Sequence, residues 1–139
     1  MKKLLAFLIS LMLLMACATE EEKQPPAEGK LADEAFVLID LIKQKYEENH
    51  IRDIEDNCSS AAFKDINLNM RKFTSAHLEF TPKTINVSRT NTVRVSMTWR
   101  GAWKVGTRDE ARQGLVVFVL EGTPLKLVAI EKASPFKQP

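Results

Sequence analysis

The stretch Thr92–Val105, TVRVSMTWRGAWKV, alternates between apolar and polar residues over its whole length. Its odd-numbered positions from Val93 onward are apolar or glycine, and its even-numbered positions are mostly polar or charged. A period of two predicts a β-strand with one face in a core and the other in water. At roughly 3.3 Å per residue this strand would run about 45 Å, so we expect a bend or bulge at Gly101 and a curved sheet.

The chain before this strand has the periodicity of helices. Apolar residues recur at three- and four-residue spacings from Leu31 to Asn49, which predicts an amphipathic helix. A short second helix is expected at Arg52–Cys58, and a third, ending near Ser75, is predicted by the stripe Phe63, Ile66, Met70 and Phe73. Cys58 is interpreted as a small buried apolar residue, with a reactive or intermolecularly paired thiol as the alternative.

Further strand segments flank the long strand. Leu78–Val87 alternates until Pro82 interrupts it, so Pro82 is expected at a sheet edge or a bulge. Leu115–Leu120, LVVFVL, is apolar on both faces and is therefore predicted at the sheet centre or in a dimer interface. Turns are expected at Arg89–Asn91, Gly106–Glu110 and Glu121–Pro124, and the last strand at Leu125–Ile130. The predicted fold class is α+β, with three helices packed on a curved four-stranded antiparallel sheet.

The N-terminus resembles that of a bacterial lipoprotein. Lys2 and Lys3 precede the apolar run Leu4–Ala16, which is too short for a comfortable membrane span and suits a signal peptide. The run ends in Leu14-Met15-Ala16-Cys17, which is similar to the lipobox. The resemblance implies that the lipoprotein signal peptidase recognises Leu14 and Ala16, and that Cys17 receives acyl chains such as palmitate. An ordinary secretory signal with a coincidental cysteine is the alternative.

This resemblance also divides the chain and suggests a compartment. Residues 1–16 are expected to be the signal peptide, residues 17–30 an acidic, proline-containing tether, and residues 31–139 the folded domain. Ala18 is not the aspartate that retains lipoproteins at the inner membrane of enteric bacteria. We therefore expect a lipid-anchored protein of the cell envelope, on the periplasmic side of the outer membrane if the host is Gram-negative.

The charge gives no case for nucleic-acid binding. The net charge is +2, and two of the positive charges lie in the expected signal peptide. The rest is uneven, because residues 31–70 hold four Lys/Arg against nine Asp/Glu and residues 71–139 hold twelve against five. A basic stripe is predicted on the even face of the long strand and its neighbours: Arg94, Arg100 and Lys104, joined by Arg112 and Lys126. It is either a solvated face or a docking site for a partner, a second copy or an anionic envelope polymer.

The element order resembles the cone-shaped nuclear transport factor 2-like fold, which is of the cystatin-like α+β kind. The resemblance spans Leu31–Glu131 and rests on the helices followed by AHLEFTPKTINVS, TVRVSMTWRGAWKVG and GLVVFVLEGTPLKLVAI. It implies a cavity between helices and sheet. Members of the family include isomerases, dehydratases and polyketide cyclases, and also proteins that only bind ligands or partners, so the fold leaves the function open.

The predicted interior offers little chemistry. The inward positions of the long strand carry no side chain that can transfer a proton, and Trp99, Trp103, Met97 and Phe118 either fill the core or line a pocket for a small hydrophobic molecule. The best remaining constellation is Tyr46, His50 and Asp53, at i, i+4 and i+7. On a continuous helix they would supply an oxyanion donor, a base and an orienting carboxylate. The alternative is a core tyrosine beside a solvated histidine.

The sequence therefore favours binding over catalysis. It contains no metal-ligand spacing, phosphate-binding loop or serine nucleophile motif, no cofactor is expected, and His77 is interpreted as a surface residue. We expect a lipid-anchored envelope protein whose domain is a non-catalytic binding or assembly module. The alternative is a small-substrate isomerase or dehydratase that uses Tyr46 and His50. The expected partners are the membrane, through the acyl chains, and either an envelope protein or a second copy, through the sheet.

Overall fold

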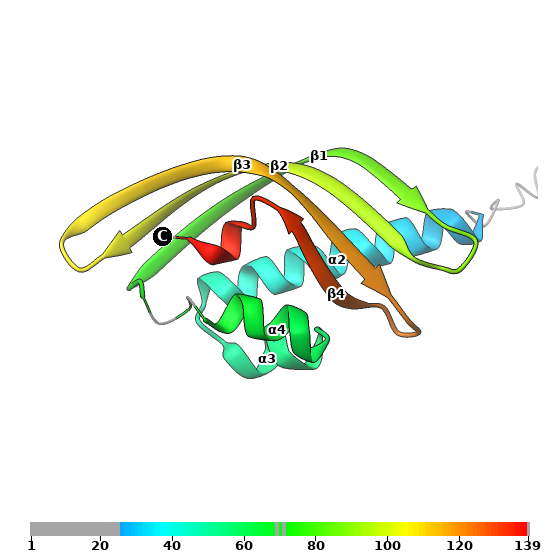
Figure 1. Ribbon diagram of the computed structural model, residues 1–139, viewed down its shortest axis with the longest axis horizontal. Helices are drawn as coiled ribbons and strands as arrows, with labels where there is room; N and C mark the ends of the chain where they lie inside the picture. The colour runs from blue at the N-terminus through cyan, green and yellow to red at the C-terminus, as the bar shows by residue number, and fades with distance from the viewer. Residues whose placement is uncertain (1–25, 69, 71, 139) are drawn as a thin grey trace, which may run out of the picture.

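The computed structural model describes residues 26–68, 70 and 72–138. The expected signal peptide, Cys17 and most of the expected tether lie outside the described residues. Within them the chain is α+β, with three α-helices followed by a four-stranded antiparallel sheet (Figure 1). No helix of this described part is long and apolar enough to cross a membrane.

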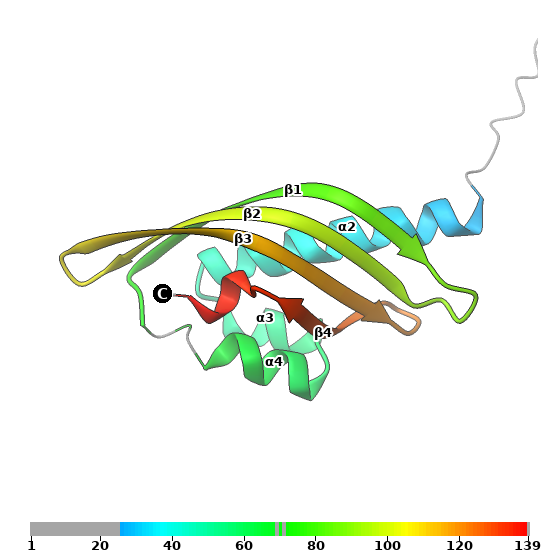
Figure 2. The same cartoon turned by 45° about the horizontal axis from the view of Figure 1, so that its top comes forward.

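The four strands follow one another across the sheet in chain order. They are β1 (Ser75–Val87), β2 (Val93–Val105), β3 (Arg108–Glu121) and β4 (Lys126–Lys132). Figures 1 and 2 show that β1, β2 and β3 curve in an arch over the helices. A curved sheet was predicted from the length of Thr92–Val105. The side of the sheet that faces the helices is called the inner face below, and the opposite side the outer face.

Strand β2 has the predicted alternation. Val93, Val95, Met97, Trp99 and Trp103 are buried on the inner face, and the even-numbered positions are exposed or half-buried. Of the bend or bulge expected at Gly101, the bulge is excluded, because β2 pairs in unbroken register with both neighbours there. A Cβ at this position would lie 2.2 Å from a ring carbon of Trp103, so the glycine makes room for the indole. The register shift lies instead at Pro82 in the edge strand β1, as predicted for a proline.

Strand β3 is longer than the sequence predicted. It begins at Arg108, and Val105 pairs with Arg108, so the hairpin turn is only Gly106-Thr107 rather than Gly106–Glu110. Gly106 has a φ of 62°, the left-handed conformation that two-residue hairpins require. The charged segment after the turn therefore belongs to the sheet, because it pairs with the far half of β2.

The central position predicted for Leu115–Leu120 is confirmed, since β3 lies between β2 and β4. Its inner face packs in the core, and Val117 and Val119 on the outer face are also buried. Val119 is opposite Arg94 on β2, and Val117 is opposite Glu131 on β4. Arg94 and Glu131 form a two-bond ion pair that spans β3 between these valines, so side chains of the same sheet cover its outer face.

The helices differ from the predictions at their ends. They are α2 (Ala27–Glu47), α3 (Ile51–Asp56) and α4 (Ser60–Asn67), and all three lie under the arch (Figure 2). Helix α2 begins directly after Pro26, so residues 27–30, the last part of the expected tether, are helical. Helix α4 begins at a Ser59 cap and ends at Asn67 rather than near Ser75. Met70 and Phe73 are still buried, but from the segment that leads into β1.

The β4 edge of the sheet is partly covered by another segment of the chain. The free edge of β4 carries the segment Asn57–Ser59, because Ser59 N donates to the Leu127 carbonyl at 2.8 Å and Leu127 N donates to the Asn57 carbonyl at 3.0 Å. After β4 the chain forms the short 3₁₀ helix η1 (Pro135–Lys137), which returns beneath the arch (Figure 1). The interior between sheet and helices therefore receives its last side chains from the C-terminus.

Candidate functional site

The interior under the arch is a cluster of aromatic side chains. The Tyr46 ring lies 5.0 Å from that of Phe73 and 4.9 Å from that of Phe136, and Trp99 meets Trp103 edge-to-face at 6.1 Å. Met97, Phe118 and both tryptophans are almost fully buried among these rings. The sequence left open whether these residues fill the core or line a pocket. In the structure Trp99, Trp103, Met97 and Phe118 are core residues.

Three side-chain polar atoms of this cluster each donate a hydrogen bond. Trp103 Nε1 donates to the Tyr46 hydroxyl at 3.0 Å, and that hydroxyl donates to the carbonyl of Gln138 at 3.3 Å. Trp99 Nε1 donates to the carbonyl of Ala133 at 2.8 Å. Each buried donor thus has an acceptor, which removes the cost of leaving it unpaired away from water.

Tyr46 is unsuited to proton transfer at neutral pH. Burial raises the pKa of its phenol to about 12, and the hydrogen bond from Trp103 only partly offsets this effect. The hydroxyl stays protonated, and its proton is already directed at a backbone carbonyl. The arrangement uses Tyr46 as a bridge between β2 and the C-terminus.

The other two candidate residues lie on the surface. The side chains of His50 and Asp53 are 59% and 52% exposed. Helix α2 stops before them, because Asn49 adopts a left-handed φ of 60°. His50 N then donates to the Lys45 carbonyl at 2.8 Å and Asn49 N to the Tyr46 carbonyl at 3.1 Å, which together form a Schellman cap. The chain reverses there, so Tyr46 points inward and the pair His50 and Asp53 outward.

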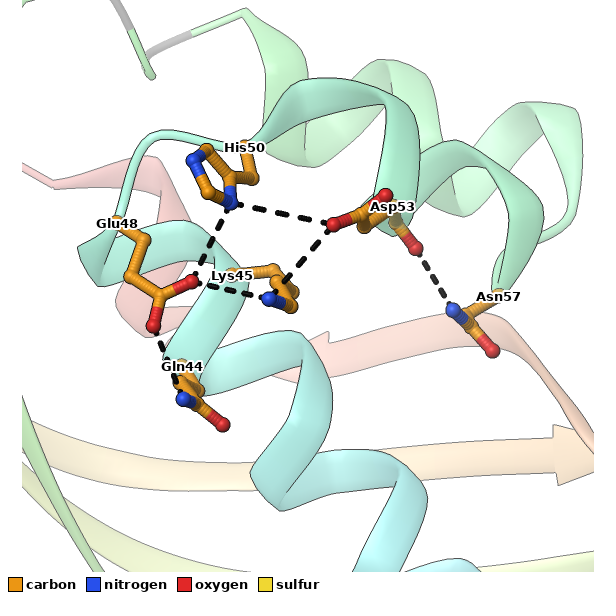
Figure 3. Close-up of polar contacts among 6 residues, drawn as sticks. All are labelled: Gln44, Lys45, Glu48, His50, Asp53 and Asn57. Atoms are coloured by element: carbon orange, nitrogen blue, oxygen red, sulfur yellow. Dashed lines mark hydrogen bonds and ion pairs between the residues drawn. The ribbon is translucent and has the colours of Figure 1, made fainter.

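His50 and Asp53 belong to a charged cluster at the junction of α2 and α3 (Figure 3). Lys45 Nζ lies 3.0 Å from Glu48 and 3.7 Å from Asp53, and His50 Nδ1 lies 3.3 Å from Glu48 and 3.9 Å from Asp53. The hydrogen bond between Lys45 and Glu48 raises the pKa of the amine and lowers that of the carboxyl. Gln44 also donates to Glu48, at 2.9 Å (Figure 3). This cluster links two helices at the surface.

The predicted basic stripe is mixed in charge. Arg94 is paired with Glu131, and this bond raises the pKa of the guanidinium and lowers that of the carboxyl. Arg100 stands directly opposite Glu79 on β1, Lys104 opposite Asp109 on β3, and Lys126 opposite Glu121. Arg112 was placed wrongly, because it is opposite Gly101 and therefore lies on the inner side, where it contacts Glu110 at 3.5 Å.

The outer face carries a shallow groove. Two adjoining hollows of about 500 and 590 Å³ share Glu79, Arg100 and Gln113 in their walls. The other outward-facing residues around them are His77, Thr81, Thr98, Ala102 and Ala111. His77 is a surface residue, as predicted, with Glu47 at 3.5 Å and Glu79 at 3.7 Å. The outer-face groove is open, polar at its rim and floored by small side chains.

Cys58 is a buried free thiol in the segment that covers β4. Burial raises its pKa to about 12, against a smaller opposite effect of Lys126, so the thiolate needed for nucleophilic or redox chemistry is not formed at neutral pH. Among residues 26–138, positions 69 and 71 aside, no group of three or more His, Cys, Asp or Glu side chains could hold a metal ion.

The structure does not bring the candidate catalytic residues Tyr46 and His50 together. Its interior is packed, and its candidate acid and base lie on opposite sides of a helix end. Comparison with known protein families, curated proteins and solved structures finds no match for the chain. The sequence reading missed Phe136 and Gln138, although Ser134-Pro135, a capping serine before a proline, signals a short helical turn at this end of the chain.

Proposed function

We propose that the protein is a lipid-anchored component of the bacterial cell envelope, and that its domain is a nuclear transport factor 2-like module that binds or assembles with a partner without catalysis. The observation that carries the proposal is that the Tyr46 hydroxyl is already hydrogen-bonded to both Trp103 and Gln138, while the His50 side chain lies on the surface. In this arrangement Tyr46 and His50 do not face each other across a space where a substrate could bind.

The anchor part of the proposal rests on the lipobox-like Leu14-Met15-Ala16-Cys17. Acylation of Cys17 would hold the domain at a membrane, which is the periplasmic face of the outer membrane in a Gram-negative host. Replacing Cys17 with serine removes the acyl acceptor. Expression in a bacterial host, fractionation and intact mass spectrometry test it: the wild-type chain should sediment with membranes and carry acyl mass, and Cys17→Ser should do neither. Membrane retention of an unacylated Cys17→Ser chain contradicts the anchor.

The partner part of the proposal rests on the outer face. The helices and η1 cover the inner face, so the outer face of β1, β2 and β3 is the broad surface of the sheet that stays open to a partner (Figures 1 and 2). Its polar rim and alternating charges favour a specific protein surface over an unspecific anionic polymer, since Arg100 and Lys104 each face an acidic neighbour. An envelope protein or a second copy of the chain meets this description.

Site-specific photo-crosslinking in living cells tests the partner proposal. A photoreactive residue in place of Thr98 lies beside the outer-face groove, and the same residue in place of the exposed Asp40 on α2 is the matched control. We expect a discrete adduct at position 98 and none at position 40. An adduct of twice the chain mass identifies a second copy. Equal labelling at both positions, or none at position 98, contradicts a docking role of this face.

A further inference from the structure

The C-terminus of the described chain inserts a side chain into the aromatic cluster. We call Ser134–Gln138 the C-terminal plug. Its central residue, Phe136, is only 1% exposed, and its ring lies 4.9 Å from that of Tyr46, 6.2 Å from that of Phe118 and 6.4 Å from that of Phe80. Figures 1 and 2 both show η1 between the arch and the helices. The plug thus occupies a pocket whose walls belong to α2, β1 and β3.

The plug is held by side chains and not by strand pairing. Two of its backbone donors bond within the plug: Lys137 N donates to the Ser134 carbonyl at 3.4 Å and Phe136 N to the Ser134 hydroxyl at 3.3 Å. Its links to other elements are the hydrogen bond from Tyr46 to Gln138 and an exposed ion pair between Lys137 and Asp65 at 3.5 Å. Exposed ion pairs stabilise little, so the plug is held mainly by the buried Phe136 ring and by the hydrogen bond from Tyr46.

The residue before the plug is fixed in a different way. Ala133 N donates to the Leu115 carbonyl at 3.0 Å, and the Ala133 carbonyl accepts from Trp99 at 2.8 Å. These bonds attach Ala133 to β3 and β2. A movement of the plug about Ser134 would therefore leave the register of the sheet and the acceptor of Trp99 unchanged.

We infer that the C-terminal plug is a displaceable intramolecular ligand, and that its withdrawal opens a binding site for a flat apolar group that carries a hydrogen-bond acceptor. The apolar group takes the place of the Phe136 ring against Phe80 and Phe118. The acceptor replaces the Gln138 carbonyl on the Tyr46 hydroxyl, which donates a proton to it. The inference goes beyond the docking role proposed for the outer face and depends neither on that partner nor on the anchor.

The plug sets the affinity of this pocket. A ligand binds only the open form, so its apparent dissociation constant is the intrinsic one divided by the open fraction. A plug seated for about 99% of the time weakens binding about 100-fold, and anything that draws the C-terminus away strengthens binding by the same factor. The pocket is thereby coupled to whatever binds the end of the chain.

The test compares full-length chains in detergent micelles, with 2-naphthoate as the probe and micelles without protein as the blank. Deletion of residues 134–139 removes the plug and leaves Ala133 in place. Binding is followed by quenching of the emission of Trp99 and Trp103, the two tryptophans of the chain. We expect saturable binding of one probe per chain, at least tenfold tighter in the deletion variant than in the wild type. A synthetic peptide of the sequence ASPFKQ should displace the probe.

A matched control separates an opened pocket from a loosened core. Phe63→Ala removes a partly buried ring from α4, outside the ring contacts of the plug. It should bind the probe as weakly as the wild type. Equal affinity of the deletion variant and the wild type, or equal affinity of Phe63→Ala and the deletion variant, overturns the inference.

If the deletion variant does not fold, hydrogen exchange on the wild-type chain tests whether the plug opens independently of the sheet. The amides of Phe136 and Lys137 are hydrogen-bonded while the plug is seated, and the amides of β2 lie in the sheet. A plug that opens alone exchanges its amides at least 100-fold faster than those of β2 under native conditions. Exchange of both sets at the same global unfolding rate overturns the inference.

Discussion

Replacing Gly101 with alanine tests how tightly the inner face is packed. The new Cβ would lie 2.2 and 2.6 Å from ring carbons of Trp103 and 2.8 Å from a methyl carbon of Leu78. The indole cannot move freely, because it is buried and its Nε1 is bonded to Tyr46. Overpacking costs about 1–3 kcal/mol and breaking the bond to Tyr46 adds about 1–3 kcal/mol, so we expect the free energy of unfolding to fall by about 2–6 kcal/mol.

The sign of this effect distinguishes the packing argument from a general property of glycine. Glycine inside a strand is about 0.5–1 kcal/mol less favourable than alanine, so without a clash Gly101→Ala would stabilise the protein. Urea unfolding followed by tryptophan emission measures the change, and a Trp103→Leu background removes the ring. In that background the cost of Gly101→Ala should fall below about 1 kcal/mol. A stabilising Gly101→Ala, or the same cost in both backgrounds, refutes the reasoning.

Three further outcomes follow from the polar contacts. Tyr46→Phe leaves the Trp103 indole N–H buried without its acceptor and should cost about 1–3 kcal/mol in urea unfolding; a cost below about 0.5 kcal/mol contradicts the hydrogen-bond bridge. The bond from Arg94 lowers the pKa of Glu131, so its stabilisation is present above the unfolded-state value of 4.5 and is lost as the pH falls through the lower folded value. The urea midpoints of wild type and Glu131→Gln should therefore differ at pH 7 and converge below about pH 4; a constant difference contradicts this contribution. Because burial raises the pKa of Cys58 to about 12, its thiol should react with a disulfide reagent at pH 8 only after urea is added, and rapid reaction of the folded protein contradicts its burial.

The sheet could be predicted from the sequence where one strand alternates cleanly. The period of two in β2 gave its face, its length and the identity of its buried residues, because alternation of side chains follows directly from strand geometry. The first half of β3 could not be found in this way. Its residues 108–114 are polar or small and have no apolar period of their own, so they belong to the sheet only because the short turn at Gly106 brings them against β2.

Tyr46 and His50 do not share a helix face, and the sequence already contained the reason. Tyr46 and His50 are four residues apart and would share a helix face if the helix continued. Asn49 stands between them, and asparagine is one of the few residues that adopts the left-handed conformation at the end of a helix. A reading that treated Asn49 as a helix end would have separated the inward tyrosine from the outward histidine. Arg94, Arg100 and Lys104 lie on the outer face as predicted, but their acidic cross-strand neighbours could not be predicted, because Glu79 and Asp109 are identified only once the register is known.

The position of the C-terminus follows from the two tryptophans that β2 turns inward. Each indole brings one N–H into a region without water, and a buried N–H requires an acceptor. The Tyr46 hydroxyl accepts the hydrogen bond from Trp103. It also has a proton of its own to donate, so it needs an acceptor as well. The carbonyls of Ala133 and Gln138 meet both needs, at 2.8 and 3.3 Å. The chain end is therefore drawn under the arch by the polar atoms of the core as well as by the Phe136 ring, and a ligand that displaces it must supply an acceptor to Tyr46.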